Sequence, residues 1–153
     1  MLTFDMNTDG IEAALDGIKA KAQAAIRPAA QAGAQVYYEA VKASVPVSTK
    51  GHWFQGTSAK SASTPASKRS ASYWFESGSL KNAVYQVYSK SGSSATQAEY
   101  QVAWNHRKVP YGFMVASGTT RAKGNDFIGN AKRSVQAQAV VAMQTELKNR
   151  IKS

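Results

Sequence analysis

The spacing of hydrophobic residues changes along this chain, and the change restricts the folds that it can adopt. Apolar residues recur at helical spacing in residues 9–44 and again in 128–151, whereas those between 79 and 119 alternate or form short runs. Helical spacing places apolar side chains on one face of a helix, and alternation places them on one face of a strand. We therefore predict an α+β fold, in which a small antiparallel sheet over 79–119 packs against N-terminal and C-terminal helices.

The N-terminal helical pattern is interrupted by a proline. Pro28 lacks a backbone N–H and its ring clashes with the preceding turn, which predicts a break between a helix near 9–26 and a second helix ending at Ser44. Small residues dominate the apolar stripe of the second helix, so a neighbouring element can approach closely. Both ordinary core packing and a seam between subunits fit this stripe.

The predicted sheet is built mainly from two segments. Residues 79–89 alternate in polarity, residues 91–94 have the composition of a turn, and residues 99–104 are the expected partner strand. A basic, polar loop over 120–125 precedes the last helix. Asp126 is expected to cap that helix by accepting backbone N–H bonds.

A long polar insertion separates the N-terminal helices from the sheet. Residues 52–75 hold a tract rich in Ser, Ala, Thr and Lys, with one aromatic triplet before it and another after it. The triplets can pair as the base of a hairpin arm, with a flexible polar tract as its tip. Five aromatic residues are the candidate interface anchors: Trp53, Phe54, Tyr73, Trp74 and Phe75. The alternative is that these side chains complete the core of the subunit itself.

The length and composition indicate one globular domain spanning residues 1–153. The chain has 43% hydrophobic and 18% charged residues, and no apolar run is long enough to cross a bilayer. Its first residues do not have the pattern of a secretory signal. Cysteine is absent, which excludes disulfides and thiolate chemistry and fits assembly in a reducing cytoplasm.

The chain is strongly basic, with a net charge of +10. Residues 77–153 carry 11 Lys and Arg against 3 Asp and Glu, while residues 1–76 carry 8 against 6. A basic half suggests an anionic neighbour, such as nucleic acid or an acidic protein ring. Four cations around the start of the last helix form a predicted basic patch: Arg121, Lys123, Lys132 and Arg133.

The residue patterns of common enzymes are missing from the sequence. The two histidines, His52 and His106, lie in different segments without a second ligand at metal-binding spacing. The acidic residues are sparse, and no glycine-rich phosphate-binding pattern occurs. We therefore predict a protein that is not an enzyme and has no cofactor or metal.

One segment combines aromatic and basic residues. Residues 104–111 contain Trp104, His106, Arg107, Lys108 and Tyr111. Such a mixture can form a stacking platform for single-stranded nucleic acid. The alternative is a sheet edge whose aromatic side chains are core and whose cations face solvent.

Four short segments, taken in order, resemble a known family. They are Pro46-Val47-Ser48-Thr49 followed by Gly51, then 77–84, then 111–119, and finally Asp126-Phe127 followed by Ala131. This order is similar to that of the neck or tail-completion proteins of tailed bacteriophages. That family has a "P-V-x-T-G-x-L" turn, a "Y-x-x-x-V-E-x-G-T" segment, and "P-F-x-x-A" at the start of a C-terminal helix. Ala116 and Asp126 stand where the family has Glu and Pro.

The resemblance implies a structural virion protein located at the junction of head and tail. Such a subunit forms a homo-oligomeric ring with other phage connector and tail proteins as neighbours, and DNA passes through the ring. It would be assembled in the host cytoplasm. The basic patch would face either DNA in the lumen or an acidic partner, and DNA contact through phosphates would be non-specific. The alternative function is that of a small basic nucleic-acid-binding protein.

Overall fold

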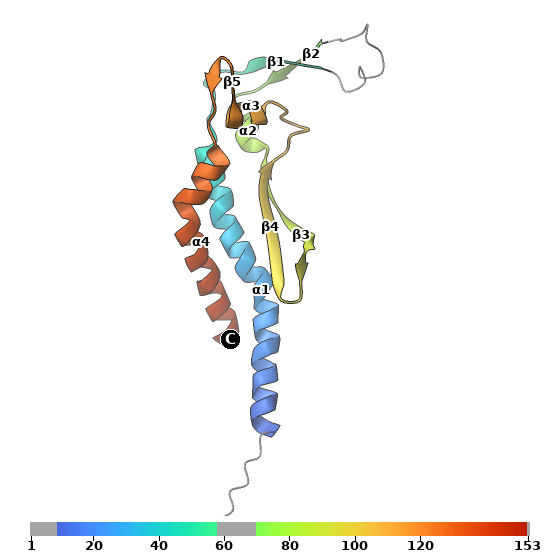
Figure 1. Ribbon diagram of the computed structural model, residues 1–153, viewed down its shortest axis with the longest axis vertical. Helices are drawn as coiled ribbons and strands as arrows, with labels where there is room; N and C mark the ends of the chain where they lie inside the picture. Colours follow the sequence, from blue (N-terminus) through green and yellow to red (C-terminus); the bar gives the residue numbers. More distant parts are fainter. Residues whose placement is uncertain (1–8, 58–69, 153) are drawn as a thin grey trace, which may run out of the picture. The chain divides into compact units, whose positions relative to one another are not determined.

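The protein has an α+β fold, as the sequence predicts. The computed structural model describes residues 9–57 and 70–152 (Figure 1). Within these residues the elements follow in the order α1 (Asp9–Ser44), β1 (His52–Thr57), β2 (Ser70–Phe75), α2 (Ser79–Asn82), β3 (Val84–Ser94), β4 (Gln97–Trp104), α3 (Gly112–Ser117), β5 (Gly118–Thr119), β6 (Ala122–Lys123) and α4 (Phe127–Lys152).

The predicted break at Pro28 is wrong, because α1 is one helix of 36 residues with Pro28 inside it. Proline removes one backbone hydrogen bond from a helix and bends it, but the other bonds of a long helix remain. Packing holds both sides of the proline, since Ala25 and Ala29 are buried. The tertiary contacts therefore outweigh the local preference.

The sheet region differs from the prediction in its details. Within the described residues the strands pair as three two-stranded sheets, β1 with β2, β3 with β4, and β5 with β6. Residues 79–82 and 112–117, which the sequence places in the sheet region, are helical. Leu80 and Val84 are both buried and four residues apart, a spacing that fits a helical turn as well as a strand.

The turn predicted at 91–94 lies farther along the chain. Strand β3 continues through Ser94, and residues 95–96 form the turn into β4. Hydroxyl groups in this region bond within the hairpin: Ser93 Oγ donates to the Ser89 carbonyl at 2.6 Å and accepts the Glu99 N–H at 2.9 Å. Ser93 thereby stabilises the β3–β4 hairpin, although the composition of residues 91–94 alone suggests a turn.

Contacts divide the chain into two compact units, and several elements contribute to both. Unit 1 takes residues 9–39, 86–102 and 133–152 of the described chain, and unit 2 takes 40–57, 70–85 and 103–132. The sequence-based division into one domain of 153 residues remains a prediction. The ends of the insertion at 52–75 form β1 and β2, and its middle, 58–69, lies outside the described residues.

Unit 1 packs two helices closely through small residues. A Cβ placed at Gly33 of α1 would lie 2.6 Å from Met143 Cγ of α4, so the Met143 side chain would have to shift to admit it. Ala25, Ala34 and Ala139 are buried in the same unit. The small-residue stripe thus serves core packing. On β3, Tyr88 lies under the Arg27 guanidinium, 4.3 Å from ring centroid to Cζ.

Unit 2 is organised around Phe127. This residue begins α4, is fully buried, and lies with its ring centroid 5.7 Å from that of Trp104. Smaller buried apolar residues of the same unit are Val41, Val45, Leu80, Val84, Val109 and Ala131. Gly112 permits the indole of Trp104 to lie against the backbone where α3 begins.

Asp126 caps α4, which confirms the sequence prediction. Its Oδ1 accepts the backbone N–H of Gly129 at 2.9 Å. Replacing Asp126 with Ala is expected to lower the free energy of unfolding by about 1 kcal/mol, because a helix N–H loses its acceptor. Urea denaturation measures the change. Asp126→Asn is the matched control, since an amide oxygen can still accept the bond; an equal loss in both variants would contradict the capping role.

Candidate interaction site

The pairing of β1 with β2 aligns the two aromatic triplets, as predicted. His52 lies opposite Phe75, Trp53 opposite Trp74, and Phe54 opposite Tyr73. Side chains alternate between the faces of a strand, and directly opposed residues share a face. The two tryptophans therefore lie on one face of this hairpin, and the other four side chains lie on the opposite face.

Tyr111 anchors one face of the hairpin within unit 2. Its ring centroid lies 4.8 Å from those of both His52 and Phe75, at interplanar angles of 75° and 72°. The ring of Phe54 lies 6.0 Å away. These are edge-to-face and tilted contacts of the kind that stabilise aromatic clusters. The hairpin is therefore held at its base by its own unit.

The opposite face is exposed. Trp53 and Trp74 are 67% and 49% exposed, and their ring centroids lie 5.4 Å apart at 62°. Trp74 also covers Gly51, where a Cβ would overlap its indole. Phe54 and Phe75 thus join the packing around Tyr111, as the core interpretation expects, whereas the tryptophans are exposed and their role as interface anchors remains a prediction. Tyr73 is also substantially exposed.

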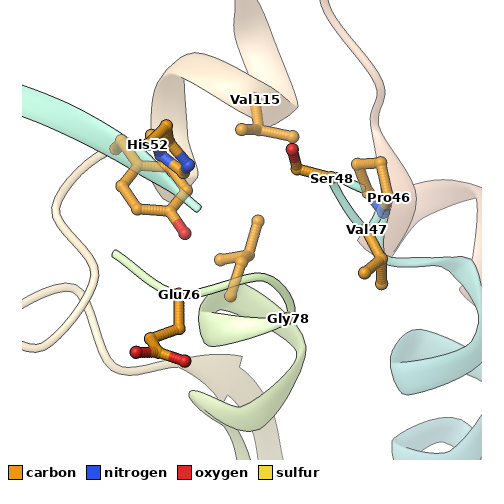
Figure 2. A pocket seen from close by; sticks show the side chains of 9 residues that line it. Pro46, Val47, Ser48, His52, Glu76, Gly78 and Val115 are labelled. Carbon is orange, nitrogen blue, oxygen red and sulfur yellow. The ribbon is translucent and has the colours of Figure 1, made fainter. Parts of the chain in front are cut away.

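An apolar hollow lies beside the anchored face of the hairpin. It has a cavity volume of about 340 Å³, and Figure 2 shows side chains from the segment after α1, from α3 and from the region before α2 around it. Its lining residues are Pro46, Val47, Ser48, His52, Glu76, Gly78, Leu80, Tyr111 and Val115. A second hollow of about 410 Å³ shares four of these and adds Lys123 and Asn125. Pockets lined mainly by apolar side chains accept apolar groups.

Hydrogen bonds fix the segment that forms one wall of the hollow. Ser48 Oγ donates to the Lys50 carbonyl at 2.7 Å, which makes a local turn after Pro46. The Ser77 hydroxyl donates to the Ser48 carbonyl and joins this turn to the segment before α2. The sequence indicated a turn at Pro46, but the side chains opposite it are brought there only by the fold.

Burial shifts the ionisation of Tyr111. Removal from water raises the pKa of its hydroxyl above the ordinary value of 10.0, and a hydrogen bond with the Leu80 backbone opposes part of that rise. In the unfolded chain the Tyr111 hydroxyl loses its proton near pH 10, whereas in the folded chain the hydroxyl is still protonated at that pH. The folded state then holds more protons, so stability is intact below pH 10 and falls as the pH rises toward the folded pKa.

Tyr111→Phe is expected to remove this component of alkaline destabilisation. Phenylalanine fills the same space between the rings but has no proton to lose. The measurement is the free energy of unfolding in urea at pH 8, 10 and 11, compared with wild type. Tyr85→Phe, at an exposed tyrosine of the same unit, is the control. An unchanged slope above pH 10 in Tyr111→Phe would contradict the argument.

Positive charge is concentrated in unit 2. Over the whole sequence, the segments assigned to unit 2 carry 11 Lys and Arg against 2 Asp and Glu, whereas those assigned to unit 1 carry 8 against 7. Unit 2 thus holds nearly all of the net charge of +10. A field of this size attracts anionic partners and accelerates their association.

The four predicted basic-patch residues are exposed, but they lie on different elements and in different units. Arg121 and Lys123 lie in the β5–β6 hairpin, where Thr119 Oγ1 accepts the Arg121 N–H at 3.3 Å. Lys132 lies on α4 within unit 2, and Arg133 on α4 belongs to unit 1. Their action as one patch remains a prediction.

The segment 104–111 follows the core interpretation. Trp104 packs on Phe127 and Gly112, and Tyr111 is buried under the hairpin. Its cations, Arg107 and Lys108, are exposed. The two rings that a stacking platform would need are thus engaged within unit 2.

Comparison with known proteins gives no match: no protein-family model, curated protein or solved structure is similar to this chain. The described helices include none that is both long enough and apolar enough to span a membrane. Within the described ranges, no three His, Asp or Glu residues are grouped as ligands for a metal ion.

Proposed function

We propose that this protein is a structural subunit of a tailed-phage virion. In this proposal it forms part of a ring at the junction of head and tail, connects the capsid connector to the tail and lets DNA pass. One observation supports it best. The four segments that resemble neck and tail-completion proteins all contribute to unit 2, and the first three of them line one hollow.

The geometry of the hollow favours binding over catalysis. Apolar side chains form most of its wall, and the Ser48 hydroxyl is tied to the Lys50 carbonyl of its own turn. Tyr111 is held among aromatic rings, and burial favours its neutral form. An apolar hollow beside an exposed aromatic face is typical of a protein interface.

Purified particles test this proposal directly. Antibody labelling and electron microscopy of virions are expected to place the protein at the junction of head and tail. A phage lacking the protein is expected to accumulate filled heads and tails that do not join. Absence of the protein from purified virions, or its location elsewhere in the particle, would contradict the proposal.

The concentration of charge in unit 2 favours one second candidate, a small basic nucleic-acid-binding protein. Phosphate contacts release counterions, so such binding weakens steeply as salt increases. Titration of the purified protein with a duplex oligonucleotide at several salt concentrations tests this candidate. Tight, salt-dependent binding by a protein that is absent from virions would favour it over the structural role.

A further inference from the structure

The first turns of α1 carry an apolar stripe that unit 1 leaves uncovered. Leu15 and Ile18 are 59% and 54% exposed, and three residues apart they lie on one side of the helix. Ala25 and Ala29 follow Ile18 by seven and eleven residues, so they lie on the same face, yet they are buried. In Figure 1 the first turns of α1, in dark blue, extend past α4 and the β3–β4 hairpin of the same unit.

Acidic residues flank this uncovered stripe. Residues 9–18 contain Asp9, Glu12 and Asp16 and no Lys or Arg, and the cations Lys19 and Lys21 follow beyond Ile18. Glu12 and Asp16 are exposed and lie one helical turn apart, on either side of Leu15 in the sequence. A short stretch of helix without packing is marginally stable in water. This end of α1 therefore combines two exposed aliphatic side chains with local negative charge.

Unit 2 offers the complementary surface. The walls of its hollows are mainly apolar. The first hollow is lined by Val47, which is exposed, and by one carboxylate, Glu76, while Lys123 lines the second hollow. Lys50 lies two residues beyond Ser48 in the turn that forms one wall, and it too is exposed. The whole unit is strongly basic. An aliphatic side chain can enter the hollow while carboxylates on the same helix meet the cations around it.

We propose that residues 12–18 of one copy bind the hollow of unit 2 on a second copy. The inference rests on the proposed ring, whose subunit contact it specifies. Charge complementarity selects this pairing, because contacts between two copies of unit 2, or between two α1 ends, would bring like charges together. The two surfaces differ, so the contact is head-to-tail and repeats from copy to copy. A repeat of this kind closes into a ring when the rotation permits.

Disulfide trapping tests the contact, since the chain has no cysteine of its own. Equal amounts of purified Ile18→Cys and Val47→Cys chains are mixed at high concentration and oxidised. We expect a mixed dimer on a non-reducing gel. The matched control is Val141→Cys, which is 60% exposed on α4 of unit 1. With Val47→Cys it is expected to give about tenfold less dimer, the ratio that a difference of about 1.4 kcal/mol in contact free energy produces.

Other trapping outcomes would overturn the inference. Dimers formed mainly by Ile18→Cys alone would assign the stripe to pairing between α1 helices. A yield equal to that of the Val141→Cys control, or no dimer, would show that the hollow does not take this helix. Loss of the mixed dimer on adding an equimolar duplex oligonucleotide would assign the basic surface to DNA.

A charge exchange gives a second, independent test. One change reverses the charge of the helix: Glu12→Lys with Asp16→Lys on the Ile18→Cys chain. The other reverses the charge near the hollow: Lys50→Glu with Lys123→Glu on the Val47→Cys chain. Either change alone is expected to abolish formation of the mixed dimer. Combining both changed chains restores opposite charges and is expected to restore the dimer. Failure of the restoration would overturn the inference. Both tests use purified protein, so their result is separate from the location of the protein in virions.

Discussion

Replacing Phe127 with alanine is expected to lower the free energy of unfolding by about 3–5 kcal/mol. Phe127 is fully buried, and among the described residues it is the one large side chain buried to this degree. The ring of Phe127 contacts Trp104. Phe127 is also the first residue of α4 and follows the capping residue Asp126 directly. Alanine would leave a cavity beside Trp104 in the core of unit 2.

A loss of that size is large compared with the roughly 5–15 kcal/mol by which natural domains are stable. Urea denaturation followed by tryptophan fluorescence and circular dichroism measures it. Phe113→Ala is the control: Phe113 lies in α3 of the same unit but is largely exposed, so its loss is expected to cost less than about 1 kcal/mol. Equal losses in the two variants would show that Phe127 does not organise the core of unit 2.

The two long helical regions were predictable from the sequence because their signals are local, whereas the short helices α2 and α3 were placed in the sheet region. The stripe in 128–151 and the carboxylate of Asp126 marked α4 to within a residue at each end. Pro28 misled the prediction of α1, since the cost of a proline is local while the burial of Ala25 and Ala29 depends on the rest of unit 1. At α2 and the start of β3, the spacing of Leu80 and Val84 does not distinguish a strand from a helical turn.

The candidate site was predictable only in part. Two aromatic triplets around a polar tract indicated a hairpin, and their alignment in β1 and β2 confirms it. Which face is anchored depends on Tyr111, which follows β2 by more than thirty residues and reaches the hairpin only in the folded chain. The hollow likewise needs the Pro46 turn, Leu80 and Val115 together. Periodicity and turn composition describe residues that are neighbours in sequence, so they do not predict contacts between residues far apart in the chain.

If the proposed virion role holds, removing both exposed indoles, Trp53→Ala with Trp74→Ala, is expected to reduce particle assembly strongly while leaving the subunit folded. Trp53 and Trp74 are 67% and 49% exposed, so the folded subunit loses only part of its aromatic packing: the contact of Trp74 with Gly51 and the direct ring contact, the latter about 0.5–1.5 kcal/mol. Buried tryptophans at an interface commonly contribute more than about 2 kcal/mol to association, which corresponds to a loss of roughly 30-fold or more in binding. The yield of infectious particles from cells supplying only the double variant measures the effect.

The opposite face of the same hairpin separates assembly from folding. Phe54→Ala removes a ring that packs on Tyr111, so it is expected to lower the stability of unit 2. Tyr85→Ala removes a partly exposed aromatic ring elsewhere in unit 2, and it is expected to cost less than about 1 kcal/mol in stability and to leave the yield unchanged. A particle yield in the double tryptophan variant equal to that of Tyr85→Ala would show that the indoles make no contact in the virion. Loss of its folded circular dichroism spectrum would instead place the pair in the subunit's own core, as the alternative interpretation of the arm requires.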